Sequence, residues 1–181
     1  ERLVLWDTPG FGDSARLAKR LRQQGNPIGW FMSQVWDRFS DQTFWLNQLA
    51  VRNTRDQADV VLYLVNAAEE PDDAGYLAPE LSVLEWIGKP VIVLLNQTGP
   101  RRPRAEEEQA EGLWRTRLQQ WSQVKSVLTL DAFARCWVQE FELFDAVDVV
   151  LEPAQRGAFA RLSIAWRARR MDQFAQAMRT L

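Results

Sequence analysis

Three short polar segments of this chain each follow an apolar run and carry residue types well suited to bind a ligand. They are Asp7-Thr8-Pro9-Gly10, Asn96-Gln97-Thr98-Gly99 and Asp131-Ala132-Phe133. The 181 residues include no histidine and one cysteine, Cys136. This composition excludes histidine-based general catalysis, His/Cys zinc sites and a disulfide framework, and we interpret Cys136 as a structural thiol. The chemistry that remains is ligand binding through carboxylate, amide and backbone groups.

Apolar runs without polar alternation predict the strands that position these segments. The runs are Leu3–Trp6, Val60–Val65, Val91–Leu95 and Val124–Leu130. Strands of a parallel sheet that is covered by helices on both faces have this pattern. Helical segments follow the runs at 14–24, 28–52, 76–87 and 105–123. This order predicts an α/β fold, a doubly wound and mostly parallel sheet followed by C-terminal helices that break near Glu152-Pro153.

The three polar segments all lie where a predicted strand ends. In open α/β sheets, ligands bind outside the carboxyl ends of the strands. We therefore expect the three segments to converge on one edge of the sheet. The run Val60–Val65 ends instead in Asn66-Ala67-Ala68-Glu69, which is less distinctive. Convergence, more than any single motif, predicts a binding site.

The series of strand ends resembles a known family. The pattern is similar to that of the translation-factor class of P-loop GTPases. It consists of an apolar strand ending in Asp7-Thr8-Pro9-Gly10, a later strand ending in Asn96, and a last strand with a short loop. Within this class, the chain resembles the Era-like group most. Members of that group carry the same Asp-Thr-Pro-Gly followed by a hydrophobic residue. The resemblance implies a P-loop NTPase G domain over residues 1–150. Residues 151–181 resemble the start of a C-terminal extension of unknown function in some bacterial GTPases.

The resemblance assigns roles to the first segment. Asp7 would hold Mg²⁺ through a water, since a hard cation that bridges phosphates prefers oxygen ligands. Gly10 would donate its backbone N–H to the γ-phosphate of GTP, with Thr8 and Pro9 in the same nucleotide-binding turn. Release of that contact on hydrolysis would make a switch. Phe11 stands where Ras-like proteins keep a catalytic glutamine, so hydrolysis would be slow without a protein partner, a potassium ion or a homodimer.

The resemblance also covers positions that would bind the base. Asn96 matches the first residue of the Asn-Lys-x-Asp motif that selects guanine, whereas Gln97 and Gly99 replace its lysine and its aspartate. The aspartate would pair with the N1–H and amino groups of guanine, so the guanine preference is weak or comes from elsewhere. Asp131 and Ala132 fall where the final loop of the family touches the base, a match by position only.

Other interpretations stay open at this point. Another doubly wound module, such as a flavodoxin-like one, could carry the same turn by chance. Asn96 could be a turn residue that satisfies loop amides. Gln97 and Gly99 also favour a degenerate nucleotide-binding module with a regulatory or scaffold role. Such a module could be associated peripherally with the membrane. A strand–GxxxxGK[ST]–helix upstream of Asp7 would support the enzyme.

The segment 28–52 makes the spacing between the first two runs longer than in a plain family member. Its aromatic and apolar residues predict one helix that directly follows the switch and could relay its movement. They are Trp30, Phe31, Val35, Trp36, Phe39, Trp45, Leu46 and Leu49. Such residues most often pack on a sheet. A face for a partner or a membrane surface is the alternative, because the three tryptophans do not share one narrow stripe.

Charge and chain ends limit the remaining expectations. A net charge of -2 gives no bulk electrostatic reason to expect nucleic acid or an anionic membrane as a partner. The arginines at 101–104 and 161–170 predict solvated helix faces. For the last helix, contact with acidic lipid head groups is the alternative. No apolar run reaches the ~18 residues of a membrane span, so we expect a cytoplasmic protein with at most peripheral membrane association. The chain begins at Glu1, and we expect a GTPase fragment that lacks the P-loop and is inactive alone.

Overall fold

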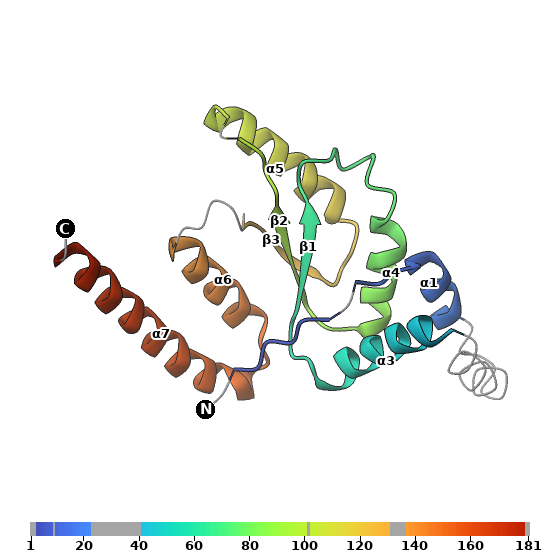
Figure 1. The fold of residues 1–181 in the computed structure, drawn as a ribbon, viewed down its shortest axis with the longest axis horizontal. Coiled ribbons are helices and arrows are strands. Elements are labelled where there is room, and N and C mark those ends of the chain that lie inside the picture. Colours follow the sequence, from blue (N-terminus) through green and yellow to red (C-terminus); the bar gives the residue numbers. More distant parts are fainter. Residues whose placement is uncertain (1–2, 9, 23–40, 101, 131–136, 180–181) are drawn as a thin grey trace.

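The computed structural model describes residues 3–8, 10–22, 41–100, 102–130 and 137–179. Helices and strands alternate along most of this length (Figure 1). In chain order they are α1 (Ser14–Arg22), α3 (Gln42–Gln57), β1 (Val61–Asn66), α4 (Leu77–Ile87), β2 (Val91–Asn96), α5 (Arg104–Leu118), β3 (Val124–Thr129), α6 (Trp137–Val150) and α7 (Pro153–Arg179).

The three strands in the described part of the chain form one parallel sheet in the order β1-β2-β3. Val61 pairs with Val91 at the start of β1 and Asn66 with Asn96 at its end, so these two strands are in register over their whole length. β2 and β3 pair with one irregularity, between Val91 and Ile92. The predicted α/β fold with a parallel sheet, flanking helices and C-terminal helices is confirmed.

The main core lies on one face of the sheet. Val91, Val93 and Leu95 alternate along β2 and point to this face, as the period of two in a strand requires. They join one buried cluster with residues of four helices, among them Leu17 of α1, Phe44 of α3, Leu81 of α4 and Trp114 of α5. α1 and α3 both pack on α4, and Figure 1 shows the three helices together on one side of the sheet.

The opposite face of the sheet is covered unevenly. Leu94 of β2 is buried there, whereas its register partner Leu64 of β1 is 60% exposed. α6 packs on β3, at the other end of the strand order. Cover from α6 therefore reaches the β3 side of this face, whereas Leu64 of β1 stays exposed.

The last two helices form an antiparallel hairpin (Figure 1). Phe144 of α6 stacks between Phe159 and Trp166 of α7, at centroid distances of 5.5 and 5.8 Å. Arg156 donates from Nε to the carbonyl of Leu151 and from Nη2 to that of Val149, each at 2.9 Å, and so satisfies carbonyls that the end of α6 would leave unpaired. The predicted break at Glu152-Pro153 is confirmed. No helix among the described residues has the length and apolar character that crossing a membrane requires.

The predicted first strand, Leu3–Trp6, is wrong. Residues 3–8 have no regular secondary structure, and the four side chains from Leu3 to Trp6 are each at least half exposed. An apolar run becomes a strand only when a neighbouring strand pairs its N–H and C=O groups. The described sheet contains β1, β2 and β3 only, so no described strand pairs with this run.

The single helix predicted over 28–52 is wrong at Asp41. This residue has a non-helical backbone and caps α3, accepting a hydrogen bond from the Phe44 N–H at 3.0 Å. The part of that prediction over 28–40 lies outside the described residues. Within α3 the buried face consists of Phe44, Asn47, Gln48 and Val51, whereas the predicted apolar members Leu46 and Leu49 are exposed. Two polar side chains thus occupy the packed face, which apolar spacing does not reveal.

Candidate functional site

The carboxyl ends of β1 and β2 lie side by side. Asn66 and Asn96 are register partners, and the Ala67 N–H donates to the Asn96 carbonyl at 2.7 Å. The Asn66 side chain accepts from the Ala68 N–H at 3.1 Å and donates to the Glu69 carboxylate at 3.0 Å. Asn66 therefore holds its own loop in a turn of the kind that asparagine favours. Asn66 and Glu69 lie at the same edge as Asn96, although the segment Asn66-Ala67-Ala68-Glu69 is the less distinctive one in sequence.

The chain turns sharply where β2 ends. Gln97 has a φ of 57° and Gly99 a φ of 79°, and Gln97 is the one non-glycine residue with positive φ among the described residues. A left-handed backbone costs about 1–2 kcal/mol for a residue with a Cβ, so Gln97 holds a conformation that the surrounding structure enforces. Such strain clusters at ligand-binding loops, which keeps Asn96-Gln97 a candidate site.

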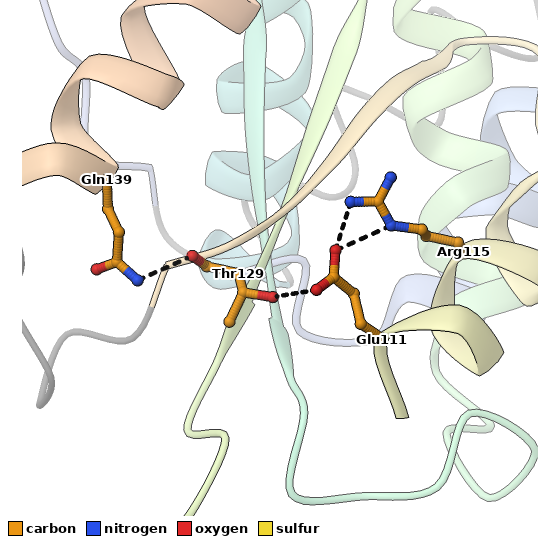
Figure 2. Close-up of polar contacts among 4 residues, drawn as sticks. All are labelled: Glu111, Arg115, Thr129 and Gln139. Atoms are coloured by element: carbon orange, nitrogen blue, oxygen red, sulfur yellow. Dashed lines mark hydrogen bonds and ion pairs between the residues drawn. The ribbon is translucent and has the colours of Figure 1, made fainter. Parts of the chain in front are cut away.

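The end of β3 is fixed from two helices (Figure 2). The Thr129 hydroxyl donates to the carboxylate of Glu111 on α5 at 3.2 Å, and Gln139 of α6 donates to the Thr129 carbonyl at 3.2 Å. Arg115 binds the same carboxylate, with its Nε 2.9 Å from Oε1. Asp131 and Ala132, which follow in the sequence, lie outside the described residues.

A buried tyrosine of β1 pairs with a partly buried glutamate of α4. The Tyr63 hydroxyl donates to the Glu80 carboxylate at 2.5 Å. Burial raises the pKa of Glu80, and the hydrogen bond from Tyr63 opposes that change in pKa without cancelling it. Burial also raises the pKa of Tyr63, and the neighbouring carboxylate raises this pKa further. The pair ties the first turn of α4 to the middle of β1.

The segment with Asp7 is not brought to this edge. Figure 1 shows the chain from Leu3 to Thr8 running past the lower part of β1, away from the arrowheads that mark the carboxyl ends. Asp7 and Thr8 are exposed, and Pro9 lies outside the described residues. A Cβ added to Gly10 would meet no atom within 4 Å, so this backbone borders open space. The predicted convergence is thus seen for Asn66 and Asn96, and it is not seen for Asp7.

The residues directly after Gly10 are tied to two helices. The Arg16 N–H donates to Asp13 Oδ1 at 2.9 Å, which begins α1 with a side-chain cap. Gly12 has a φ of 58°, and a Cβ there would lie 3.0 Å from Nδ2 of Asn47 on α3. Phe11 is partly buried against the main core. The loop after the Asp-Thr-Pro-Gly segment is therefore packed between α1 and α3.

The donor set limits which metal the site could hold. Among the described residues, no group of three or more Asp, Glu, His or Cys side chains is placed to bind a metal ion. A cation that needs an all-protein cage is therefore not supported there. Mg²⁺ is usually held by one or two carboxylates together with phosphates and waters, and the single exposed carboxylate of Asp7 fits that mode.

Comparisons with known proteins found no match to a family model, a curated protein or a solved structure.

Proposed function

We propose that this chain is part of a GTP-binding, GTP-hydrolysing molecular switch of the bacterial Era-like type. The observation that carries the proposal is the parallel sheet whose central strand β2 ends in Asn96 and the left-handed Gln97, level with Asn66. Ligands of open α/β sheets bind outside this edge. The sequence Asp7-Thr8-Pro9-Gly10, the motif by which such proteins sense the γ-phosphate, supports the same assignment.

In this proposal Asp7 binds Mg²⁺ through a water, and Gly10 donates its N–H to the γ-phosphate. The open space around Gly10 supports such a close approach. Mg²⁺ would neutralise charge on the β- and γ-phosphates. Phe11 packs against the core and carries no group that could orient a water, so turnover requires a protein partner, a second copy or a monovalent cation.

The open edge of β1 supports a further strand in the complete switch. β1 is an edge strand of the described sheet, and Leu64 on its uncovered face is 60% exposed. Exposed edge strands readily pair with another strand. We propose that the strand leading into the phosphate-binding loop pairs here, and that Leu3–Trp6 joins the sheet only when that strand is present. Asp7 would then reach the carboxyl edge.

Nucleotide competition on the full-length protein tests the function. We expect micromolar GTP binding that depends on Mg²⁺, and slow hydrolysis that Asp7→Ala abolishes. Unchanged turnover in Asp7→Ala would remove the role of this residue. Equal affinity for ATP and GTP would leave a nucleotide hydrolase without guanine selection. Residues 1–181 alone should bind little nucleotide. Tight binding by them would contradict the proposal that the phosphate-binding loop lies outside this chain.

A degenerate module with a regulatory or scaffold role, peripheral to the membrane in one version, is the second candidate. Gln97 and Gly99 favour it, because Gln97 replaces the lysine of the specificity motif and Gly99 replaces the aspartate that reads guanine. It predicts that the full-length protein hydrolyses no nucleotide at any Mg²⁺ concentration, whether or not a nucleotide binds. The hydrolysis measurement therefore separates the two candidates directly.

A further inference from the structure

The α6–α7 hairpin presents an incompletely covered apolar face. α7 has 27 residues and α6 has 14, so α7 extends beyond its partner. The ion pair between Arg170 and Glu140, at 2.6 Å, lies near the start of α6. Beyond it, every residue from 171 to 179 is exposed. Met171 and Met178 on that part of α7 are 49% and 57% exposed.

The exposed side chains of α7 follow a seven-residue repeat. Ile164, Met171 and Met178 are each seven residues apart, and Phe174 lies three residues after Met171. All four are between 48% and 69% exposed. Apolar residues at this spacing form the seam through which helices pack side by side. Arg167 occupies the remaining position of the seam, between Ile164 and Met171.

α6 has its own exposed stripe on the same face of the hairpin. Val138, Glu142, Asp145 and Val149 are spaced by four, three and four residues, which aligns them along one side of a helix, and all are exposed. Asp145 forms an ion pair with Arg167 of the α7 seam. Since this pair bridges the two stripes, they form one continuous face, which we name the hairpin face.

The charges of the two helices are complementary. The four charged residues of α6 are all acidic, at 140, 142, 145 and 148, whereas α7 carries six arginines and one aspartate. Within one copy, Arg167 and Arg170 already pair with Asp145 and Glu140. If two copies meet face to face around a two-fold axis, the acidic α6 of one lies against the basic α7 of the other. An anionic lipid surface would instead meet Glu142 and Asp145 on the same face.

We propose that the hairpin face is the surface through which two copies of this chain associate. The association joins α6 and α7 of each copy into a four-helix arrangement. Ile164, Met171, Phe174 and Met178 form its apolar centre, and the charges of α6 and α7 set its antiparallel orientation. This inference is independent of nucleotide binding, because the face lies on helices that follow the sheet.

Sedimentation of residues 1–181 tests the association. We expect a dimer at concentrations on the order of 100 µM, Met171→Glu to shift it to a monomer, and salt on the order of 1 M to weaken it. Gln176→Glu is the matched control, since it adds the same charge to the same exposed helix off the seam and should leave the dimer intact. Circular dichroism should show that both variants keep their helices.

Two results would overturn the proposal. One is a wild-type chain that stays monomeric throughout this concentration range, and the other is a Met171→Glu variant that dimerises as the wild type does. Vesicles of phosphatidylserine and phosphatidylcholine provide the competing outcome. If monomers bound these vesicles and Met171→Glu abolished that binding, the hairpin face would be a membrane surface instead.

Discussion

Arg16 of α1 joins Asp41, the residue that caps α3, although 24 residues separate the two in sequence. Its Nη1 lies 2.6 Å from Asp41 Oδ2, while the other carboxylate oxygen accepts from the Phe44 N–H at 3.0 Å. The Arg16 guanidinium also lies over the Phe44 ring, 3.9 Å from its centroid. One arginine therefore connects the helix that follows the Asp-Thr-Pro-Gly segment to the first turn of α3. In the proposed switch, this is the contact through which movement after Gly10 would reach α3.

Asp41 should make stability depend on acid pH. Its hydrogen bond from Arg16 and that from the Phe44 backbone hold its pKa below the usual value. The stabilisation is therefore present above the unfolded pKa and is lost as pH falls through the folded pKa. We expect Asp41→Asn, which keeps a cap oxygen but loses the charge, to lower the urea midpoint at neutral pH and to approach the wild type as pH falls below the folded pKa of Asp41. Asp41→Ala should remain less stable at neutral and at acid pH, because it removes the cap as well.

Glu80 should have the opposite pH dependence. Its pKa is raised by burial, so the carboxylate is harder to ionise in the folded state. Stability is then greatest below the unfolded pKa and falls as pH rises through the folded pKa. We expect Glu80→Gln to gain stability over the wild type as pH increases from about 4 to about 7. Tyr63→Phe should cost about 1 kcal/mol and steepen the pH dependence, since it removes the donor to Glu80. A loss in Glu80→Gln that is constant with pH would contradict this.

The sequence predicted correctly the strand that is buried on both faces. The prediction was wrong where strand formation depends on a neighbouring strand. Val91–Leu95 is an uninterrupted apolar run, and β2 is indeed buried along almost its whole length. Leu3–Trp6 is also an uninterrupted apolar run, but it has no described neighbouring strand and is exposed. α3 shows another limit. Its packed face includes Asn47 and Gln48, so a search for apolar periodicity assigns the wrong residues to the core.

Only part of the candidate site could be predicted from the sequence. The register between two strands depends on how they pair, and the sequence of one strand does not determine it. Asn66 and Asn96 meet only because β1 and β2 align from Val61–Val91 onward, which no local motif encodes. The contacts of Thr129 with Glu111 and Gln139 likewise depend on how three consecutive elements, α5, β3 and α6, pack together. Asn96 was recognisable from its position after an apolar run, whereas Asn66 lacked a distinctive neighbour. The roles of Asp7, Asn96, Asp131 and Ala132 in nucleotide binding stay predictions.

A matched pair of leucines tests the uneven cover of the sheet. Leu94 and Leu64 are register partners on the same face, but Leu94 is 4% exposed and Leu64 is 60% exposed. We expect Leu94→Ala to lower the free energy of unfolding by about 2–5 kcal/mol, because it leaves a cavity. Leu64→Ala should cost less than about 1 kcal/mol in this chain. Urea unfolding followed by tryptophan fluorescence measures both. Equal losses would mean that another element covers β1.

Gly12 and Gly99 form the second matched pair, since both have positive φ but only one has a close neighbour. A Cβ at Gly99 would meet nothing within 4 Å, so Gly99→Ala should cost only the left-handed backbone, about 1 kcal/mol. Gly12→Ala adds a contact 3.0 Å from Asn47 Nδ2 and should cost more. Asn47→Ala in the Gly12→Ala background should recover part of that extra loss, which a double-mutant cycle in urea would measure. Additive losses would show that the loop after Gly10 does not pack against α3 in solution, and the connection from Gly10 to α3 would then rest on Arg16 alone.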